Sequence, residues 1–403
     1  MTVAATASVH PASPATGTRA ADILDRIRTF VHAEVLPAAD HFDTLPPAPT
    51  PASVRLAEAG LANWWIPAEY GGPGVSLRDS VDIVSELSYG DAGFAFGSFL
   101  SVLGTTMLQL SGADDLTRPH LERLARDGGV LGILASEEEA GSELGRITTT
   151  CRRAGDSVVV TGDKYFSTNT DAADLLLVVA RDAADDADFG VVLVPRHTEG
   201  VELTQRWDMI GMRGSATYRV ALRDCAVPAH HRLPGNGLRL LEIGLNASRI
   251  LIAATAIGMA RRVRDLAMEY AASKRVHGAP LTRNAVFAGK LGQIEMLIDV
   301  MRNQCRAAAE EFDGYLAGGD AAGALYRVGT LRSALAAKMY CGQAGWQVAT
   351  IGSEMFGGLG YTHEHPIGKL VRDLRYVGLV EGGDDVIREL LFTRYVVPTG
   401  KRR

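Results

Sequence analysis

The sequence predicts an α+β protein in which helical segments flank a β-rich middle segment. Apolar residues recur at helical spacing over residues 20–128, as at Ile23 and Ile27. Short β-rich runs follow over residues 130–228, and long helical segments resume after residue 234. This order favours separate helical and β domains over a doubly wound sheet.

The two changes of pattern predict the domain boundaries. A chain of 403 residues allows two to four domains at about 100 to 200 residues each. We expect a flexible tail over 1–18, an N-terminal helical domain over 19–129, a β domain over 130–234 and a C-terminal helical bundle over 235–403.

Individual elements follow from the same periodicities. The predicted strands lie at 130–136, 157–162, 174–180, 189–195 and 218–228, between glycine and acidic turns. The predicted C-terminal helices lie at 238–274, 286–316, 325–352 and 385–396. Long helices with short connections favour an antiparallel bundle.

Composition excludes several classes of partner. Forty-one Lys and Arg against 47 Asp and Glu give a net charge of -6 without a basic stripe, so we expect no nucleic-acid partner. No apolar run approaches the roughly 18 residues that span a bilayer, so no membrane is expected. The N-terminal residues lack a basic start and an apolar core, so we expect no secretory signal there. The four cysteines are far apart in the sequence, at Cys151, Cys225, Cys305 and Cys341, which indicates neither a disulfide framework nor a zinc site. This usage fits a cytoplasmic protein.

The segment 354–388 contains a suggestive carboxylate, Glu381. It follows the apolar residues Val377, Leu379 and Val380, and dry surroundings raise the basicity of a carboxylate. Gly382 and the next glycine leave bare backbone that a flat ligand or acyl group can approach. The local alternative is a helix that ends at a glycine cap.

Polar motifs in the β segment have two readings each. Ser136 and Ser142 flank an acidic turn and could bind a heterocycle edge and a phosphate, or lie on an ordinary surface turn. Strand alternation puts Phe166 and Thr168 on one face, where the ring could cover a flat cofactor and the Thr168 hydroxyl could bond it. An ordinary hairpin strand is the alternative. Arg213, in a tight loop, suits an anionic ligand or pins the loop.

Motifs in the C-terminal third are individually weak. Arg249, near Asn246 in an apolar helix, is by itself more often a paired structural charge than a ligand contact. Arg275 and His277 stand at a predicted helix C-terminus, where the helix dipole favours cations. No metal is expected, because the histidines lack the i, i+4 spacing of a zinc helix.

Taken in order, these motifs resemble the acyl-CoA dehydrogenase family over nearly the whole chain. The matching segments are IPAEYGGPG at 66–74, the stretches 136–143, 162–169 and 357–361, Arg213-Gly214-Ser215, Arg372-Asp373 and Glu381-Gly382. The resemblance implies an N-terminal helical domain, a middle β-barrel domain and a C-terminal four-helix bundle. It also implies FAD bound between subunits of a homodimer or homotetramer.

The resemblance further implies the chemistry. A carboxylate removes the α-proton of an acyl thioester while hydride leaves the β-carbon for flavin N5, which forms a trans-2-enoyl thioester. Glu381 matches the family's commonest base position, and Ser248 stands at the alternative position and cannot act as a base. Electron-transfer flavoprotein is the expected electron acceptor.

The resemblance also implies roles for three sets of residues: the catalytic base, the cofactor-binding residues and the substrate-binding residues. The catalytic base is Glu381. The cofactor residues are Ile133, Ala135, Ser136, Gly141, Ser142, Phe166, Ser167, Thr168, Arg275, His277, Glu354, Gly357, Gly358, Gly383 and Asp385. The substrate residues are Ser142, Asn246, Arg249 and Gly382.

Departures from the family pattern leave alternatives open. Asn246 replaces the usual Asp of the carrier channel, so the thioester is carried by CoA or by an acyl carrier protein. His277, Ala285, Glu354 and Asp385 differ from the residues usual near adenosine. The alternatives are an acyl oxidase or flavin monooxygenase on the same fold, and a noncatalytic carrier-protein partner.

Overall fold

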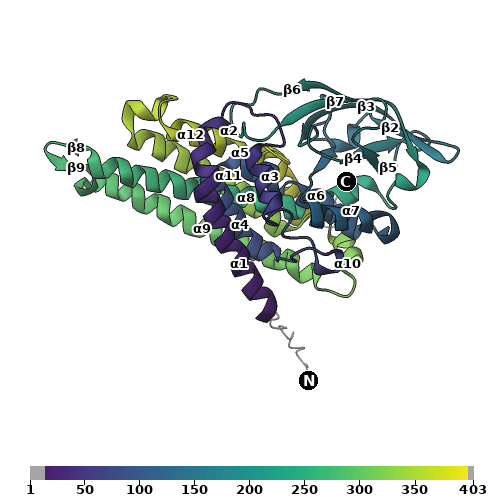
Figure 1. Cartoon of the computed structure of the whole chain (residues 1–403), viewed down its shortest axis with the longest axis horizontal. Helices are drawn as coiled ribbons and strands as arrows, with labels where there is room; N and C mark the ends of the chain where they lie inside the picture. Colours follow the sequence, from purple (N-terminus) through teal and green to yellow (C-terminus); the bar gives the residue numbers. More distant parts are fainter. Residues whose placement is uncertain (1–13, 398–403) are drawn as a thin grey trace.

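The computed structural model describes residues 14–397, and its N-terminal part is helical (Figure 1). Local capping fixes several of these helices: Ser76 accepts the Asp79 N–H at the start of α4, and Asp91 accepts the Phe94 N–H at the start of α5. The helices are α1 (Pro14–Phe30), α2 (Ala39–Phe42), α3 (Pro51–Glu58), α4 (Leu77–Gly90), α5 (Ala92–Phe99), α6 (Ser101–Leu110) and α7 (Asp114–Asp127). Of the predicted tail, residues 1–13 lie outside the described residues, and Pro14 already begins α1.

The middle domain is a curled seven-stranded sheet. Its strands are β1 (Leu131–Leu134), β2 (Thr150–Ala154), β3 (Ser157–Thr168), β4 (Leu175–Asp182), β5 (Phe189–Pro195), β6 (Val201–Arg206) and β7 (Thr217–Pro228). The hydrogen-bonded order is β1-β4-β2-β3-β7-β6, and β5 pairs with β4. Because β1 and β2 both pair in parallel with successive parts of β4, the sheet curls there.

Five strands of this sheet lie where the sequence predicts them, and the other two, β2 and β6, were not predicted. β2 and β6 carry mostly polar or exposed residues, so neither shows a clear apolar pattern. Both are instead held by pairing with a long neighbour, β2 with β3 and β6 with β7.

The C-terminal part is a helical bundle. It contains α8 (Gly237–Ser273), α9 (Ala285–Leu316), α10 (Ala321–Val328), α11 (Arg332–Met355), α12 (Pro366–Val377) and α13 (Asp384–Leu391). A short hairpin of β8 (Arg275–Val276) and β9 (Ala279–Pro280) joins α8 to α9. Figure 1 shows this hairpin at one end of the long helices and the β-sheet domain at the other.

The predicted helix over 325–352 is wrong as a single element. The chain breaks at Gly329, whose φ of 73° closes α10, and α11 begins at Arg332. The break is held from α8, because Asn246 donates to the Gly329 carbonyl at 2.8 Å and accepts the Leu331 N–H at 2.8 Å. Tertiary hydrogen bonds therefore override a continuous helical pattern.

The expectation that no apolar stretch reaches membrane-spanning length also needs correction. Ala92–Leu110 and Gly237–Ser273 are long and apolar enough by length and composition. In the most apolar window of each, 83% and 89% of the residues are buried inside the protein. These stretches therefore face protein and form its core.

Candidate active site

Glu381 lies in the turn between α12 and α13, here called the Glu381 turn (residues 378–384). α12 is held by a buried stripe that ends at Val377, and α13 begins at Asp384. The Asp384 N–H bonds the Gly378 carbonyl at 3.3 Å and closes the turn. Glu381 has a φ of 51° and Gly382 a φ of 95°, so two successive residues adopt the left-handed conformation. Because α12 has its C-cap at Gly378 and α13 its N-cap at Gly383, Glu381 caps neither helix.

The Glu381 carboxylate has one anchored oxygen and one open oxygen. The Ser248 hydroxyl, on α8, donates to Oε1 at 2.5 Å. Oε2 is buried and has no hydrogen-bond partner among the described residues. Burial raises the pKa of Glu381 to about 7, although the Ser248 hydrogen bond and the charges of Arg249 and Lys338 oppose the rise. The carboxyl is thus poised near neutral pH with a free lone pair.

Two buried cations hold the backbone of the Glu381 turn. Arg249 Nε donates to the Glu381 carbonyl at 3.0 Å, and Lys338 Nζ, on α11, donates to the Gly382 carbonyl at 2.5 Å. Burial lowers the pKa of both side chains, that of Lys338 to about 8. Sequence reasoning assigned Arg249 to the substrate and missed Lys338. The signal was present: a single lysine inside the apolar stretch ALAAKMYCG (334–342).

Asn246 is buried three residues before Arg249 on α8. Its amide and its carbonyl are both bonded to the chain break at Gly329 and Leu331 described above. The predicted role of Asn246 in the carrier channel stays a prediction, and its known contacts are structural.

The predicted flavin residues Phe166 and Thr168 lie at the C-terminal end of β3. The Phe166 ring is 53% exposed and lies 5.0 Å from the rings of Tyr165 and Trp207. The Thr168 hydroxyl is buried and bonds that of Thr217 at 2.9 Å. A register shift between Lys164 and Ser167 interrupts the simple alternation that the sequence predicts. The exposed Phe166 ring offers a flat apolar surface to a planar ligand.

A buried ion pair fixes the loop that carries Ser136. Lys164 Nζ lies 3.0 Å from Glu137 Oε1 and 2.9 Å from the Ala135 carbonyl. Glu137 also accepts the Thr148 and Thr149 N–H groups, and this environment lowers the pKa of Glu137 to about 2 despite burial. The Tyr165 N–H bonds the Ser136 carbonyl at 2.9 Å, which places the loop beside β3.

The remaining predicted cofactor residues of β1, β3 and the β1–β2 connection range from buried to exposed. Gly141 and Ser142 are exposed, and a Cβ added at Gly141 would meet nothing within 4 Å. Ile133, Ala135 and Ser136 are half-buried, and Ser167 is buried. The structure thus brings together the predicted inner part of a flavin site from β1, β3 and their connection.

The predicted outer part gathers at the opposite end of the bundle. Arg275 and His277 are exposed at the β8–β9 hairpin. Glu354 ion-pairs with Lys290 near the start of α9, at 2.5 Å. Gly357 and Gly358 are exposed, with open space around both. Figure 1 shows this hairpin far from the β sheet, so a single chain does not unite the two parts.

The two predicted cofactor residues at the start of α13 differ in their position and contacts. Gly383 is the N-cap of α13, and Asp385 is exposed and pairs with Arg388 in the first turn of that helix. They lie on the Glu381 turn side of the bundle, next to the candidate base.

The loop of Arg213 is pinned by protein contacts. Arg213 donates to the Asp43 carbonyl at 2.6 Å and to Asp208 at 2.6 Å. The neighbouring Met212 N–H bonds Asp373 on α12 at 2.6 Å. Of the two readings of this motif, the structure supports loop fixation, which ties the β domain to the helix that leads into Glu381.

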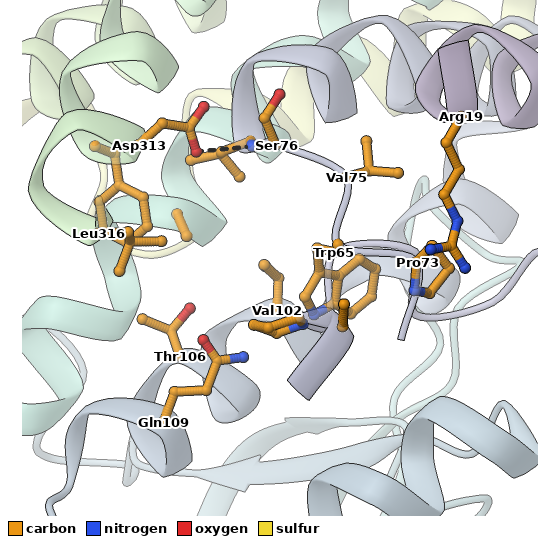
Figure 2. Close-up of a pocket in the computed structure, with 16 residues that line it drawn as sticks. Arg19, Trp65, Pro73, Val75, Ser76, Val102, Thr106, Gln109, Asp313 and Leu316 are labelled. Atoms are coloured by element: carbon orange, nitrogen blue, oxygen red, sulfur yellow. Dashed lines mark hydrogen bonds between the residues drawn. The ribbon is translucent and has the colours of Figure 1, made fainter. Parts of the chain in front are cut away.

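A separate cavity of about 390 Å³ lies between the N-terminal helices and the bundle. Figure 2 shows Trp65, Val75 and Val102 around its open centre, with Thr106 and Gln109 on one side. Ala247 also lines it, one residue before Ser248, but Glu381 does not. The cavity is therefore distinct from the surroundings of the candidate base.

Comparison with known families matches the whole arrangement. Residues 19–128, 132–225 and 235–395 match the N-terminal, middle and C-terminal domains of acyl-CoA dehydrogenase, in that order. Together these matches span more than half of the chain. The chain belongs to the acyl-CoA dehydrogenase family. It is accordingly an oxidoreductase, and enzymes of this family use FAD.

Individual members of the acyl-CoA dehydrogenase family are distant relatives of this chain. It is 28% identical to the probable acyl-CoA dehydrogenase YngJ of Bacillus subtilis, over 91% of this chain and 95% of that protein. It is also 28% identical to a 3-(aryl)acrylate reductase of Clostridium sporogenes, over 89% and 93%. The relatives differ in their named reactions, so the family alone does not fix the substrate.

Solved structures share the fold. Butyryl-CoA dehydrogenase from Megasphaera elsdenii superposes with a TM-score of 0.84 at 23% identity, covering 95% of this chain and 98% of that one. An acyl-CoA dehydrogenase complexed with FAD from Bacillus anthracis gives 0.85 at 23%, covering 93% and 66%. The prolyl acyl carrier protein oxidase AnaB gives 0.81 at 21%, covering 94% and 98%. At these identities the likeness concerns the fold.

Proposed function

We propose that this protein is an FAD-dependent α,β-dehydrogenase of an acyl thioester, with Glu381 as the base that removes the α-proton. The observation that carries the proposal is the state of the Glu381 carboxyl. One oxygen is anchored by Ser248, the other is buried and unpartnered, and burial raises its pKa to about 7. A base with this pKa is ionised in about half of the molecules at neutral pH, and it remains basic enough to accept a proton.

The residues around Glu381 support this role. Ser248 fixes Oε1, which leaves the lone pairs of Oε2 for the proton. Arg249 is buried beside the turn, and its Nη1 has no hydrogen-bond partner among the described residues. We infer that Nη1 donates to substrate, which agrees with the predicted substrate role of Arg249. Tyr376, half-buried near Glu381, packs its ring on that of Phe96 with the ring centroids 5.1 Å apart.

The residues present fit FAD, which would accept the hydride from the substrate β-carbon. The exposed Phe166 ring and the Thr168 hydroxyl would hold the isoalloxazine, and Ser136 would bond its polar edge. Since the β8–β9 hairpin, which carries Arg275, lies far from the β sheet (Figure 1), a neighbouring subunit would supply the outer set. The proposal therefore includes a homodimer or homotetramer. We further propose a cytoplasmic enzyme, as its four free cysteines favour, with electron-transfer flavoprotein as acceptor.

The test is an anaerobic screen for flavin bleaching. Purified flavoprotein is mixed with short, branched and aromatic acyl-CoAs, and then with the same acyl groups on acyl carrier protein. Bleaching by at least one thioester is expected, together with its loss in Glu381→Gln. Glu389→Gln, an exposed carboxylate on α13, is the matched control and should bleach at the wild-type rate. Equal bleaching by Glu381→Gln would show that another group is the base.

An oxidase acting on a tethered acyl group is the second candidate. It is favoured by Asn246, which is committed to backbone contacts where a carrier contact is expected. Activity confined to the carrier-protein substrates, with peroxide released in air at the turnover rate, would support it. Bleaching by free acyl-CoA with slow reoxidation in air would support the dehydrogenase.

A further inference from the structure

We propose that Lys338 is a positioning residue for the candidate base: its ammonium group fixes the Gly382 carbonyl and thereby holds the Glu381 carboxylate where it can accept a proton. The inference rests on the proposed role of Glu381. Lys338 does not touch the carboxylate by a hydrogen bond, so it acts through the backbone of the Glu381 turn.

The contact geometry supports this role. The Lys338 side chain is fully buried, and Nζ lies 2.5 Å from the Gly382 oxygen. One helical turn later, a Cβ added at Gly342 would lie 2.9 Å from the Cα of Gly378. α11 therefore contacts the turn at both ends, once by close backbone packing and once through the ammonium group.

Backbone conformation explains why the turn needs such support. Glu381 and Gly382 both have left-handed φ values, and a glutamate in that conformation is strained. Arg249 holds the first carbonyl and Lys338 the second. Cations from two helices thus fix two consecutive peptide groups. These hydrogen bonds hold the turn in a backbone conformation that is strained by itself.

The chemistry of a buried lysine argues against a plain packing role. An ammonium group out of water is costly, and an apolar side chain of similar volume would fill the same space better. The charged groups that face Lys338 are Asp384, Arg249 and Glu381. Those that face Glu381 are Arg249 from α8 and Lys338 from α11, with Tyr376 from α12 close by. The lysine charge therefore also favours the ionised form of Glu381.

The experiment compares Lys338→Met and Lys338→Arg with the wild type. Arg332→Met is the matched control, because it removes an exposed cation from the same helix. Anaerobic flavin reduction is measured with butyryl-CoA, octanoyl-CoA and 3-phenylpropionyl-CoA as probes over a range of pH. Hydrogen–deuterium exchange of peptides that span the Glu381 turn is followed by mass spectrometry without substrate.

We expect Lys338→Met to slow the limiting rate of flavin reduction by about tenfold to a hundredfold, with little change in substrate Kd. Its pH profile should move to higher pH, because a cation near Glu381 is lost. Exchange in the turn should accelerate. Lys338→Arg should recover most of the rate, and Arg332→Met should match the wild type.

Other outcomes separate the two proposals. Wild-type rate and exchange in Lys338→Met would overturn the role of Lys338. If Lys338→Met does not fold, Lys338→Gln is measured in its place. If neither variant folds, Lys338 has a purely structural role and the proposal is overturned. If no thioester reduces the wild-type flavin, the proposed function fails, while the exchange comparison still tests the hold of Lys338 on the turn.

Discussion

Removal of the Ser248 hydroxyl should move the pH dependence of catalysis upward. Burial raises the pKa of Glu381 to about 7 from an ordinary value of 4.5, and the Ser248 hydrogen bond limits that rise. A hydrogen bond to a charged group is worth about 1.5 to 3 kcal/mol, or about one to two pH units. In Ser248→Ala the pKa should therefore reach about 8 or higher, and the ionised fraction at pH 7 should fall from about one half to about one tenth.

The assay is kcat/KM against pH, because this ratio reports the ionisation of the free enzyme. Since the base must be ionised, the wild-type value should rise with pH, bend near 7 and level off above. Ser248→Ala should be about fivefold slower at pH 7 and should approach or exceed the wild-type plateau above pH 9. Ser248→Thr, which keeps a hydroxyl, is the control and should retain the wild-type profile.

Two results would contradict a desolvated Glu381 carboxyl that is stabilised by Ser248. A wild-type profile that bends between pH 4 and 5 would mean that the carboxyl is not desolvated in the working enzyme. A Ser248→Ala profile at the wild-type position, or at lower pH, would mean that the hydroxyl does not stabilise the carboxylate.

Three further variants test the surrounding structure. Glu137→Gln should lose about 3 kcal/mol of stability at neutral pH, because the Glu137 carboxyl has a pKa of about 2 in the fold and the substitution leaves Lys164 buried without its anion. The stability advantage of the wild type, measured by thermal unfolding, should disappear as the pH falls from 4.5 through 2. Phe166→Ala should weaken FAD retention about tenfold, measured by flavin release on dilution, because the ring surface is lost. Asn246→Ala should lower stability by about 2 to 4 kcal/mol, measured by urea unfolding, because it leaves two buried backbone groups unpaired.

Each of these variants has a contrary outcome. A stability difference in Glu137→Gln that persists at pH 2 would mean that the ion pair is not its source. Full FAD retention in Phe166→Ala, with Phe166→Trp as the positive control, would remove the ring from the flavin site. If Asn246→Ala keeps its stability and has a raised KM, the result would support the predicted contact between Asn246 and the thioester carrier.

The sequence predicts the domain order because each domain has its own periodicity. The apolar runs of β3, β4, β5 and β7 are visible in the sequence, and the long helices α8 and α9 differ from their predicted bounds by one residue. The break before α11 is not visible, because Asn246, far away in sequence, supplies the hydrogen bonds that hold it. β6 is not visible in the sequence for a similar reason, because its pairing with β7 and not its own composition makes it a strand.

The succession of helical, β and helical segments, and the place of Glu381 among apolar residues, follow from local sequence patterns. The surroundings of that carboxyl depend on how three helices pack, because Ser248 and Arg249 come from α8, Lys338 from α11 and Tyr376 from α12. The physical reason is that the pKa of a group and the shape of a strained turn depend on burial and on charges brought together across space. Local patterns fix the elements, whereas this environment exists only after they have packed.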